Sequence, residues 1–388
     1  MIKSNSYEAK KRINMKSDRS EIKQNQRNNQ TYLLNFIKQN SFCTFINCDS
    51  EGLFLSHINI IEEKELFFGH LSAGNPQAKQ LKNGSKILAV FKDTQQGDRN
   101  SMAVHLHGSV RLIENDEVLA ASMTNLISKF ESERPTPWSI DWSDSMFKTQ
   151  MNGIVGFYVV PEKIEKVTTP IADNKNVTIL ADVCPHKNVS LRVPVEKLST
   201  FRLTPIYTPR YFVEKRQDIL EEFISSQQSC IAIVYNESGC LNVHHANLSI
   251  VSENEDKLKL SGRLVTAGEG SQEKAGDTLK SIVVFNGAHT YISPTWYKTP
   301  HSVPTWNYIT AHVHGEIKIL DREIVGRECL LDVELEVSRI DGKYKLNQNR
   351  THEDREGVIS GLGASAFEAD QEVCKLMQRF SSATTSKF

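Results

Sequence analysis

Hydrophobic and polar residues alternate along the chain in a pattern that predicts mostly short strands. After a polar opening, apolar residues first recur at helical spacing from Tyr32 to Ile37, which predicts a short amphipathic helix. Apolar or alternating runs of strand length follow, separated by turn signals such as Asp49-Ser50-Glu51-Gly52. The predicted strands are 42–47, 53–60, 66–71, 87–91, 104–113 and 153–160, with a helix over about 118–132 before the last strand.

The same order of elements restarts in the second half of the chain. Four positions match at one offset of 187 residues: Phe36 with Phe223, Cys43 with Cys230, Gly52 with Gly239, and His57 with His244. Farther along, Phe91 matches Phe285, and His105-Leu106-His107-Gly108 matches His312-Val313-His314-Gly315. Matches in one order and at a fixed spacing indicate an internal duplication.

Each copy therefore has about six strands and few long helices, a pattern typical of a small antiparallel barrel with peripheral helices. We expect a mainly β (α+β) chain of two tandem six-stranded antiparallel barrels. Joined copies commonly imitate a homodimer, so we expect them to pack as a single-chain pseudo-dimer, which is compatible with a monomeric chain. The expected divisions are a disordered basic tail at 1–28, copy one at 29–169, a linker at 170–205, and copy two at 206–388 with a C-terminal helix.

Composition narrows the class of protein. The 388 residues are 39% hydrophobic, with a net charge of -1, so the chain can bury real cores but lacks the electrostatic footprint of a dedicated nucleic-acid binder. No apolar run approaches the ~18 residues of a spanning helix, and no secretory signal opens the chain. Seven cysteines without a C-x-x-C pair argue against a disulfide framework and a structural zinc site. We expect a cytoplasmic protein without membrane contact; DNA contact through the basic tail has no motif to support it.

The first candidate for chemistry is the segment 69–79, where a strand ends in a glycine turn. Asn75-Pro76 has the pattern of an N-cap followed by the first helical residue. Free N–H groups there, with Lys79 one turn on, could hold a phosphate. An ordinary strand-to-helix connection explains the same residues, and this segment alone favours that interpretation.

The second candidate is the aromatic segment 285–308. Two of the four tryptophans and three tyrosines fall between residues 291 and 308, interleaved with Ser, Thr, Asn and His. Such polar side chains favour a concave site for a flat aromatic ligand, which needs both stacking and hydrogen bonds at its edge. Packing of aromatic side chains between the copies is the alternative.

Two further motifs are weaker. Lys343, Lys345, Arg350 and Arg355 give a local positive charge able to meet a phosphate, although charged surface turns look similar. The two imidazoles of each His-x-His-Gly motif face one side of a strand. No neighbouring carboxylate or Cys completes a recognisable metal site in the sequence, so we expect no metal and interpret them as satisfied histidines between the copies.

Several of these segments resemble one known family. They are 206–212, the aromatic segment through Val313-His314-Gly315, 345–349, and in copy one His57, 69–77 and 153–157. Over most of 30–165 and 206–380 the sequence resembles the PaiB-type FMN-binding transcriptional regulators, within the pyridoxamine-phosphate-oxidase-like split barrels. The resemblance implies a six-stranded split barrel, a dimer, and FMN held at the subunit interface. It implies a regulator, yet no helix-turn-helix is obvious here.

The two copies depart from the family in complementary ways. Copy one keeps 69–77 and the helix before its last strand, whereas copy two keeps the aromatic segment and 345–349. We therefore expect one composite FMN site between the copies, with its phosphate end at 74–79 and its ring-facing wall at 291–308. The residues expected to bind FMN are His70, Gly74, Asn75, Gln77, Lys79, His289, Tyr291, Ser293, Trp296, Tyr297, Trp306, Asn307, Tyr308, Lys345, Gln348 and Asn349.

Alternatives remain open at this point. The flavin could serve an oxidoreductase of the same class rather than a regulator, and a degenerate scaffold that binds nothing small is a third possibility. A haem-handling role, known among other split barrels, is a further alternative. No residue is assigned a catalytic role.

Overall fold

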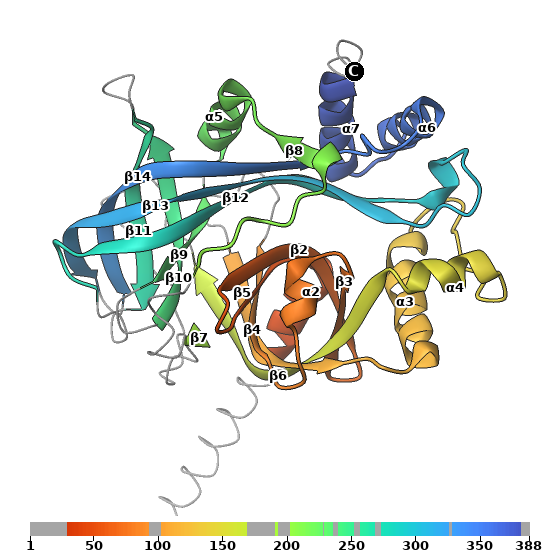
Figure 1. The fold of residues 1–388 in the computed structure, drawn as a ribbon, viewed down its shortest axis with the longest axis horizontal. Helices are drawn as coiled ribbons and strands as arrows, with labels where there is room; N and C mark the ends of the chain where they lie inside the picture. The colour runs from red at the N-terminus through yellow and green to blue at the C-terminus, as the bar shows by residue number, and fades with distance from the viewer. Residues whose placement is uncertain are drawn as a thin grey trace, which may run out of the picture.

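A computed structural model describes residues 29–92, 102–168, 191–192, 202–227, 229–235, 240–251, 257–267, 273–325 and 328–381 (Figure 1). The expected basic tail and most of the expected linker lie outside these residues, so the proposed domain divisions stay a prediction. Residues 29–39 are helical, as the apolar spacing predicts. No helix in the described part of the chain is long and apolar enough to cross a membrane.

The N-terminal barrel is closed by six antiparallel strands in the order β1-β2-β3-β6-β5-β4. All six predicted strands are confirmed, and the last extends well beyond the predicted end. Their bounds are β1 Phe42–Cys48, β2 Leu53–Glu63, β3 Leu66–Ser72, β4 Lys86–Lys92, β5 Met102–Leu112 and β6 Ile154–Thr168. Alternate side chains of these strands point inward, and Phe45, Phe67 and Phe157 are fully buried in the core that they enclose.

The C-terminal barrel repeats this order as β9-β10-β11-β14-β13-β12, because β14 pairs with β11 and closes the ring. Its strands are β9 Cys230–Tyr235, β10 Cys240–Ile250, β11 Lys259–Ala267, β12 Thr278–Ile292, β13 Thr305–Val325 and β14 Glu328–Lys345. Two short strands join this sheet: β7 (Leu191–Arg192) pairs with β10, and β8 (Val213–Glu214) pairs with β14. The repeated order confirms the duplication.

The strand register corrects one of the sequence matches. Thr44 of β1 lies opposite His57, whereas the equivalent residue of β9, Ile231, lies opposite His245. The β9–β10 hairpin is thus one residue longer than the β1–β2 hairpin. The counterpart of His57 is therefore His245, and the match to His244 is wrong.

The glycine of each His-x-His-Gly motif marks the same irregularity in both barrels. The register shifts between His107 and Gly108 in β5, and between His314 and Gly315 in β13. A Cβ atom on Gly108 would lie 2.4 Å from the Val160 carbonyl oxygen, and one on Gly315 would lie 2.1 Å from that of Glu336. Only glycine lets the neighbouring backbone approach so closely at this bulge.

The barrels differ in what connects their strands. Between β5 and β6 the N-terminal barrel inserts α3 (Asp116–Glu131) and α4 (Ser145–Met151), whereas β13 leads directly toward β14. Between β12 and β13 the C-terminal barrel instead carries the aromatic segment, with the short helix η3 (Pro294–Trp296). The predicted C-terminal helix is a pair, α6 (His352–Gly363) and α7 (Glu368–Ser381).

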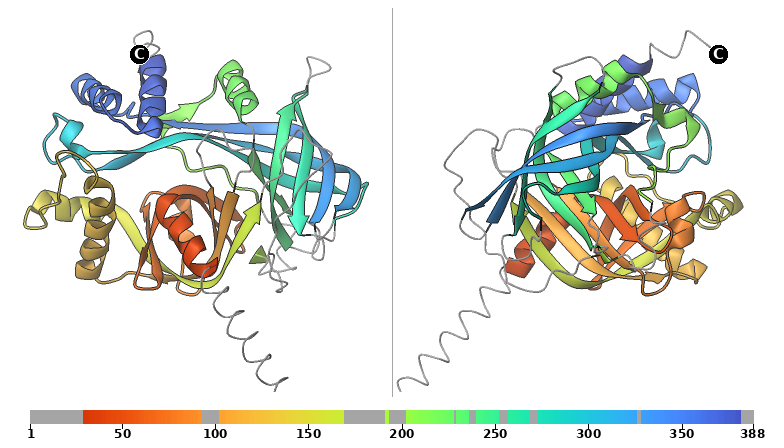
Figure 2. Two further views of the ribbon diagram at one scale, coloured as in Figure 1. Left: turned by 180° about the vertical axis from the view of Figure 1, so that it is seen from behind. Right: turned by 60° about the vertical axis from the view of Figure 1, so that its left-hand side comes forward.

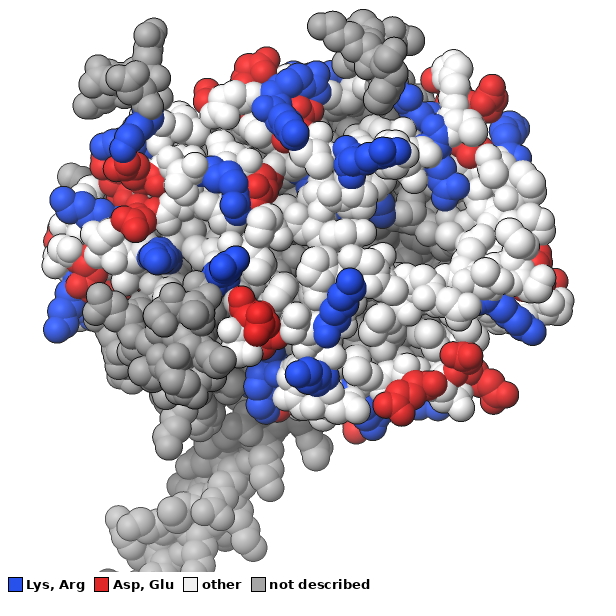
Figure 3. Space-filling view, in the orientation of Figure 1, with Lys and Arg blue, Asp and Glu red and all other residues white. Residues whose placement is uncertain are grey.

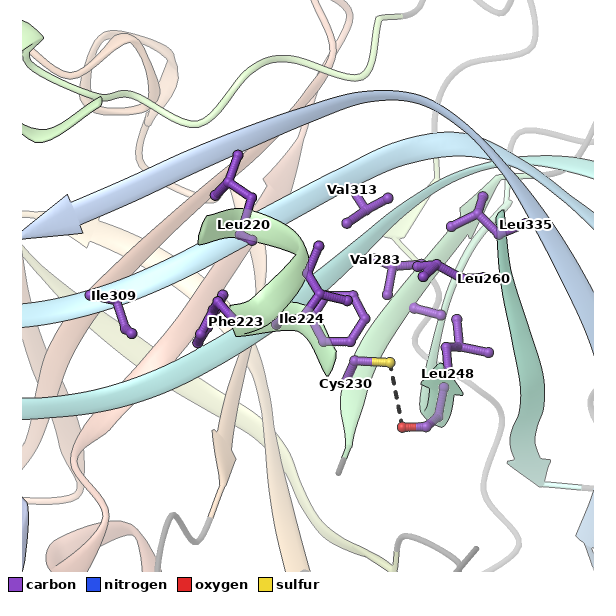
Figure 4. Packing of buried hydrophobic residues seen from close by; sticks show 14 of the residues in the cluster. Leu220, Phe223, Ile224, Cys230, Leu248, Leu260, Val283, Ile309, Val313 and Leu335 are labelled. Atoms are coloured by element: carbon purple, nitrogen blue, oxygen red, sulfur yellow. Dashed lines mark hydrogen bonds between the residues drawn. The ribbon is translucent and has the colours of Figure 1, made fainter. Parts of the chain in front are cut away.

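Helices and barrel occupy opposite sides of the long C-terminal strands. In Figures 1 and 2, α6, α7 and α5 (Gln217–Ser226) lie on one side of β12–β14, and the N-terminal barrel lies on the other. Leu220, Phe223 and Ile224 of α5 pack onto the core of the C-terminal barrel, where the Cys230 thiol donates to the Ala246 carbonyl over 3.4 Å (Figure 4).

One hydrophobic cluster contains equivalent strands from both barrels. Ile46, Leu55 and Val90 come from β1, β2 and β4, and the matching strands β9, β10 and β12 contribute side chains to the same cluster; those residues are Ile231, Ile233, Leu241, Ile282 and Val284. Strands β1 and β4 are therefore buried on both faces, which explains why their sequences read as nearly continuous apolar runs.

Candidate functional site

The structure brings parts of the expected site together from both barrels. His70 of β3 is close enough to Lys345 of β14 for that positive charge, after burial, to lower the pKa of His70, to about 4. Nearby, a Cβ atom on Gly74 would lie 3.1 Å from the hydroxyl oxygen of Tyr207, which precedes β8 in the C-terminal half. In Figure 3 this face is hollowed below the long C-terminal strands, with Lys and Arg side chains along the upper edge of the hollow.

Two lysines of β14 form the most charged part of this boundary. Lys343 is 8% exposed and donates from Nζ to the Tyr207 carbonyl over 2.7 Å, while half-buried Lys345 donates to the Thr305 hydroxyl over 2.7 Å. Burial and the charge of Lys345 lower the pKa of Lys343 to about 7; burial and Arg350 lower that of Lys345 to about 8. In the described chain no carboxylate is among the groups that shift either pKa.

A polar atom without a partner faces the same region from the N-terminal barrel. Nδ1 of His70 is buried and makes no hydrogen bond within the described residues. An unpaired buried polar atom costs about 1–3 kcal/mol. His70 thus gives this boundary a nitrogen that can still donate or accept a hydrogen bond.

The start of α2 (Pro76–Gln80) does not offer the free N–H groups that its sequence suggests. Asn75 accepts from the Gln77 N–H at its side-chain oxygen, and the N–H of Ala78 donates to the Asn75 carbonyl. The N–H of Gly74 donates to the Ser72 hydroxyl. The expectation of free N–H groups here is therefore wrong, and the ordinary strand-to-helix connection describes the segment.

The side chains of this segment are also engaged within the N-terminal barrel. Asn75 donates to the Ser56 hydroxyl over 2.8 Å, and Gln77 donates to the side-chain oxygen of Asn47 over 2.8 Å. Lys79 is exposed on α2. Contact of these residues with phosphate stays a prediction, but their geometry is already explained by folding.

The aromatic segment packs against the N-terminal barrel. Trp306 stacks on Phe42, with ring centroids 5.7 Å apart, and meets Phe130 of α3 edge-on at 4.9 Å. Tyr291 donates from its hydroxyl to Glu131 over 2.9 Å, and Arg134 lies 4.5 Å from the ring centroid of Trp296. Packing between the copies, the alternative raised from the sequence, accounts for these contacts; a ligand-facing role for the same rings stays a prediction.

The remaining expected residues divide between support and surface. Asn347 donates to the Tyr297 hydroxyl, and Trp306 donates to Nδ1 of His289. Ser293 caps η3 and Gln348 accepts from the Leu346 N–H, so both hold the local backbone. Asn307 is fully buried, and Tyr308 lies beside Lys343, whereas Asn349 is exposed.

Some residues of the boundary were not in the expected set. Lys343 was noted only as part of a basic turn, yet it is the more deeply buried of the two lysines. The Lys-x-Lys spacing places both on one face of a strand, and that was the available signal. Phe42, Phe130, Glu131 and Arg134 carry no motif and were missed.

Histidines from the two barrels meet in two equivalent pairs. Nε2 of His57 lies 2.9 Å from Nε2 of His312, and Nε2 of His105 lies 2.8 Å from Nε2 of His245. Burial lowers the pKa of His57, to about 3, and that of His105, to about 4. The interpretation of satisfied histidines between the copies is confirmed for these four.

A cavity of about 730 Å³ lies elsewhere, on the C-terminal barrel. Its lining includes Leu203, Tyr235, Lys280, His314 and Arg339, and none of the residues expected to bind FMN.

Two barrels that share a basic and aromatic boundary are the architecture expected of a flavin-binding barrel protein. A family model described as "Putative FMN-binding domain" matches residues 22–96, 99–163 and 206–352, which together exceed half of the chain. The chain belongs to this family, and FMN is the cofactor that membership assigns to it.

Named relatives are more distant. The protease synthase and sporulation protein PAI 2 of Bacillus subtilis is 27% identical over 161 residues, which cover 37% of this chain and 77% of that protein. An uncharacterized protein of Emericella nidulans is 24% identical over 166 residues, covering 30% of this chain and 66% of its own length. Among solved structures, a putative pyridoxamine 5'-phosphate oxidase from Corynebacterium glutamicum is 12% identical and covers 36% of this chain and 90% of its own, with a TM-score of 0.26. A regulatory and an oxidoreductase role for the present chain both stay predictions.

Proposed function

We propose that this chain binds one FMN in a composite site at the boundary between its two barrels, which pack as a single-chain pseudo-dimer. The phosphate lies toward Lys343 and Lys345 of the C-terminal barrel, facing His70 and Gly74 of the N-terminal barrel. The isoalloxazine lies toward the aromatic segment. The observation that carries this proposal is the pair of lysines that are buried together without a carboxylate among the groups acting on them.

The physical argument is one of missing charge. An ammonium group that is taken out of water needs an opposite charge or loses its proton more easily, and both lysines have lowered pKa values. A phosphate monoester carries about -1.5 to -2 charges at pH 7 and several acceptor oxygens. Such a group would restore both pKa values and accept charge-assisted hydrogen bonds from the two Nζ atoms.

The residues fit FMN better from β14 than from α2. The backbone donors at the start of α2 are already used, whereas Nδ1 of His70 has no partner among described atoms. We therefore move the phosphate end from Lys79 to the two lysines, and keep His70 and Gly74 as its N-terminal wall. When bound, FMN supplies electron-transfer chemistry, while the protein orients the ring and shields it from water.

One site rather than two is expected because the barrels are not equivalent here. The strand registers make Val167 of β6 the counterpart of Lys343. The C-terminal barrel, in turn, has no helix between β13 and β14 where the N-terminal barrel has α3 and α4. The shared hydrophobic cluster from equivalent strands supports the pseudo-dimer that joins the two half-sites.

The test compares two lysine positions in the full chain. Replacing both lysines (Lys343→Gln with Lys345→Gln) removes the counter-charges, and we expect FMN affinity to fall about 10- to 100-fold in a flavin-fluorescence titration. Lys79→Gln is the matched control, with an expected change of less than about twofold. Equal affinity in all three proteins would contradict the proposed phosphate end, and loss of affinity in the Lys79→Gln protein alone would return it to α2.

A further inference from the structure

A second cluster of polar side chains lies away from the lysines, within the N-terminal barrel. His105 and His107 are two residues apart on β5, so their imidazoles share one face. The strand register places Glu165 of β6 directly opposite His105. One donor atom from each of these three residues lies within 4.8 Å of the other two.

The contacts within the cluster show how it is held. Nε2 of His107 lies 2.8 Å from Oε1 of Glu165, and Lys163 donates to the other carboxylate oxygen over 2.5 Å. His105 and His107 are buried, whereas Glu165 is about one-quarter exposed at its side chain. The carboxylate thus connects a buried pair of imidazoles to the surface.

The protonation states at neutral pH are those that bind metal ions. Burial lowers the pKa of His105 to about 4. Burial alone would raise the pKa of Glu165, but hydrogen bonds from His107 and Lys163 lower it to about 2. A neutral imidazole and an ionised carboxylate need to lose no proton before they coordinate an ion.

The other barrel supplies a nitrogen at the edge of this cluster. Nε2 of His245, on β10, lies 2.8 Å from Nε2 of His105. Two such nitrogens at this distance share a single proton, so one of them has a free lone pair. An ion bound by His105 would replace that shared proton.

The duplicated residues provide an internal comparison. His312, His314 and Asp341 occupy the positions equivalent to His105, His107 and Glu165, and His314 lies 2.9 Å from Asp341. Here, however, Nη2 of Arg339 lies 3.1 Å from Nε2 of His314 and 3.1 Å from Oδ2 of Asp341. The guanidinium already places a cation between the imidazole and the carboxylate. The equivalent residue, Lys163, contacts only Glu165.

We propose that His105, His107 and Glu165 bind a divalent first-row transition-metal ion, and that the equivalent set in the C-terminal barrel does not. Two imidazoles and one carboxylate are donors that suit Zn²⁺, Co²⁺, Fe²⁺ or Mn²⁺ and leave further coordination positions open. Ligands about 2.0–2.2 Å from a tetrahedral ion lie roughly 3.3 Å from one another, so a closing movement of the order of 1 Å completes the site. The proposal does not depend on flavin binding.

Cobalt titration of the untagged full chain, after EDTA treatment, tests the site. The visible absorption of protein-bound Co²⁺ reports the ion, and Zn²⁺ should displace it. We expect saturation at one Co²⁺ per chain, and loss of this saturable binding in His107→Ala and in Glu165→Gln. His314→Ala and Asp341→Asn are the matched controls and should bind as the unaltered chain does.

A second readout guards against variants that fold poorly. Co²⁺ should raise the thermal-unfolding midpoint of the unaltered chain and of His314→Ala, but leave that of Glu165→Gln unchanged. Saturable binding that is missing from the unaltered chain, or that survives both His107→Ala and Glu165→Gln, would overturn the proposal. Equal loss in the variants of both barrels would overturn its assignment to the N-terminal set.

Discussion

The two barrels of this chain share one strand order but carry their extra elements in different places. The N-terminal barrel has α3 and α4 between β5 and β6, and the C-terminal barrel has the aromatic segment between β12 and β13. Each addition rests on the other barrel, as the contact of Trp306 with Phe42 and Phe130 illustrates. Once two copies are fused, each needs to keep only one half of a shared boundary, and this explains how the halves could diverge.

What the barrels still share is equally informative. Both keep a histidine pair across the boundary, a His–carboxylate contact, and a glycine at the same bulge. These features belong to the packing of the barrels, which both copies still require. The predictions below test that division between shared and divided features.

The largest expected effect is the loss of stability in mild acid. His57 and His105 have pKa values of about 3 and about 4 in the folded chain, against an ordinary value near 6.5. Below pH 6.5 the unfolded chain binds more protons, so stability is complete above that pH and falls as the pH decreases. Each of these histidines should cost about 2 kcal/mol by pH 5, or about 4 kcal/mol for the two.

Urea unfolding at pH 7.5 and pH 5 measures this difference. The replacement His105→Gln should lower the stability at pH 7.5 but reduce the change between the two pH values by about 2 kcal/mol. A pH dependence identical to that of the unaltered chain would show that His105 is not held neutral at the boundary.

The next effect concerns a glycine that both barrels retain. Gly315→Ala should destabilise the chain by about 3 kcal/mol, because the new Cβ atom would meet a backbone oxygen that cannot move aside. Gly108→Ala should act similarly in the other barrel. Thermal unfolding compares them with Gly363→Ala, where the nearest atom would lie 3.6 Å away and no loss is expected.

A smaller effect is expected at the divided boundary. Trp306→Leu removes the ring that lies between Phe42 and Phe130, and should cost about 2 kcal/mol of stability without flavin. Denaturant unfolding of the flavin-free protein measures this cost. An unchanged midpoint would mean that the aromatic segment does not join the barrels by packing.

The smallest effect tests a single hydrogen bond across the boundary. Tyr291→Phe removes the donor to buried Glu131 and should cost about 1 kcal/mol. Tyr211→Phe, at an exposed tyrosine, should change stability by less than about 0.5 kcal/mol and serves as the control in the same unfolding experiment.

Much of the fold could be predicted because it depends on local patterns. Strand-length apolar runs and their repetition are sufficient for the strand order and the duplication. The exact match of His57 failed by one residue because the extra residue lies in a hairpin, where the sequence pattern is weak. The long C-terminal strands and the paired C-terminal helices add detail that the pattern does not contain.

The site was less predictable because it depends on contacts between distant residues. Glu165 lies 58 residues after His107, so the sequence could not indicate that β6 would place a carboxylate beside that imidazole. The start of α2 has the pattern of an anion site, but Asn75 and neighbouring carbonyls satisfy its N–H groups within the fold. Lys343 became notable only when folding showed it buried beside Lys345.

The number of flavins per chain tests the composite site most directly. Protein saturated with FMN and freed of excess ligand should carry one FMN for each polypeptide, measured by flavin absorbance against protein concentration. A ratio near two would mean that each barrel completes a site of its own, and a ratio near zero would mean that the boundary holds no flavin; either result would contradict the account.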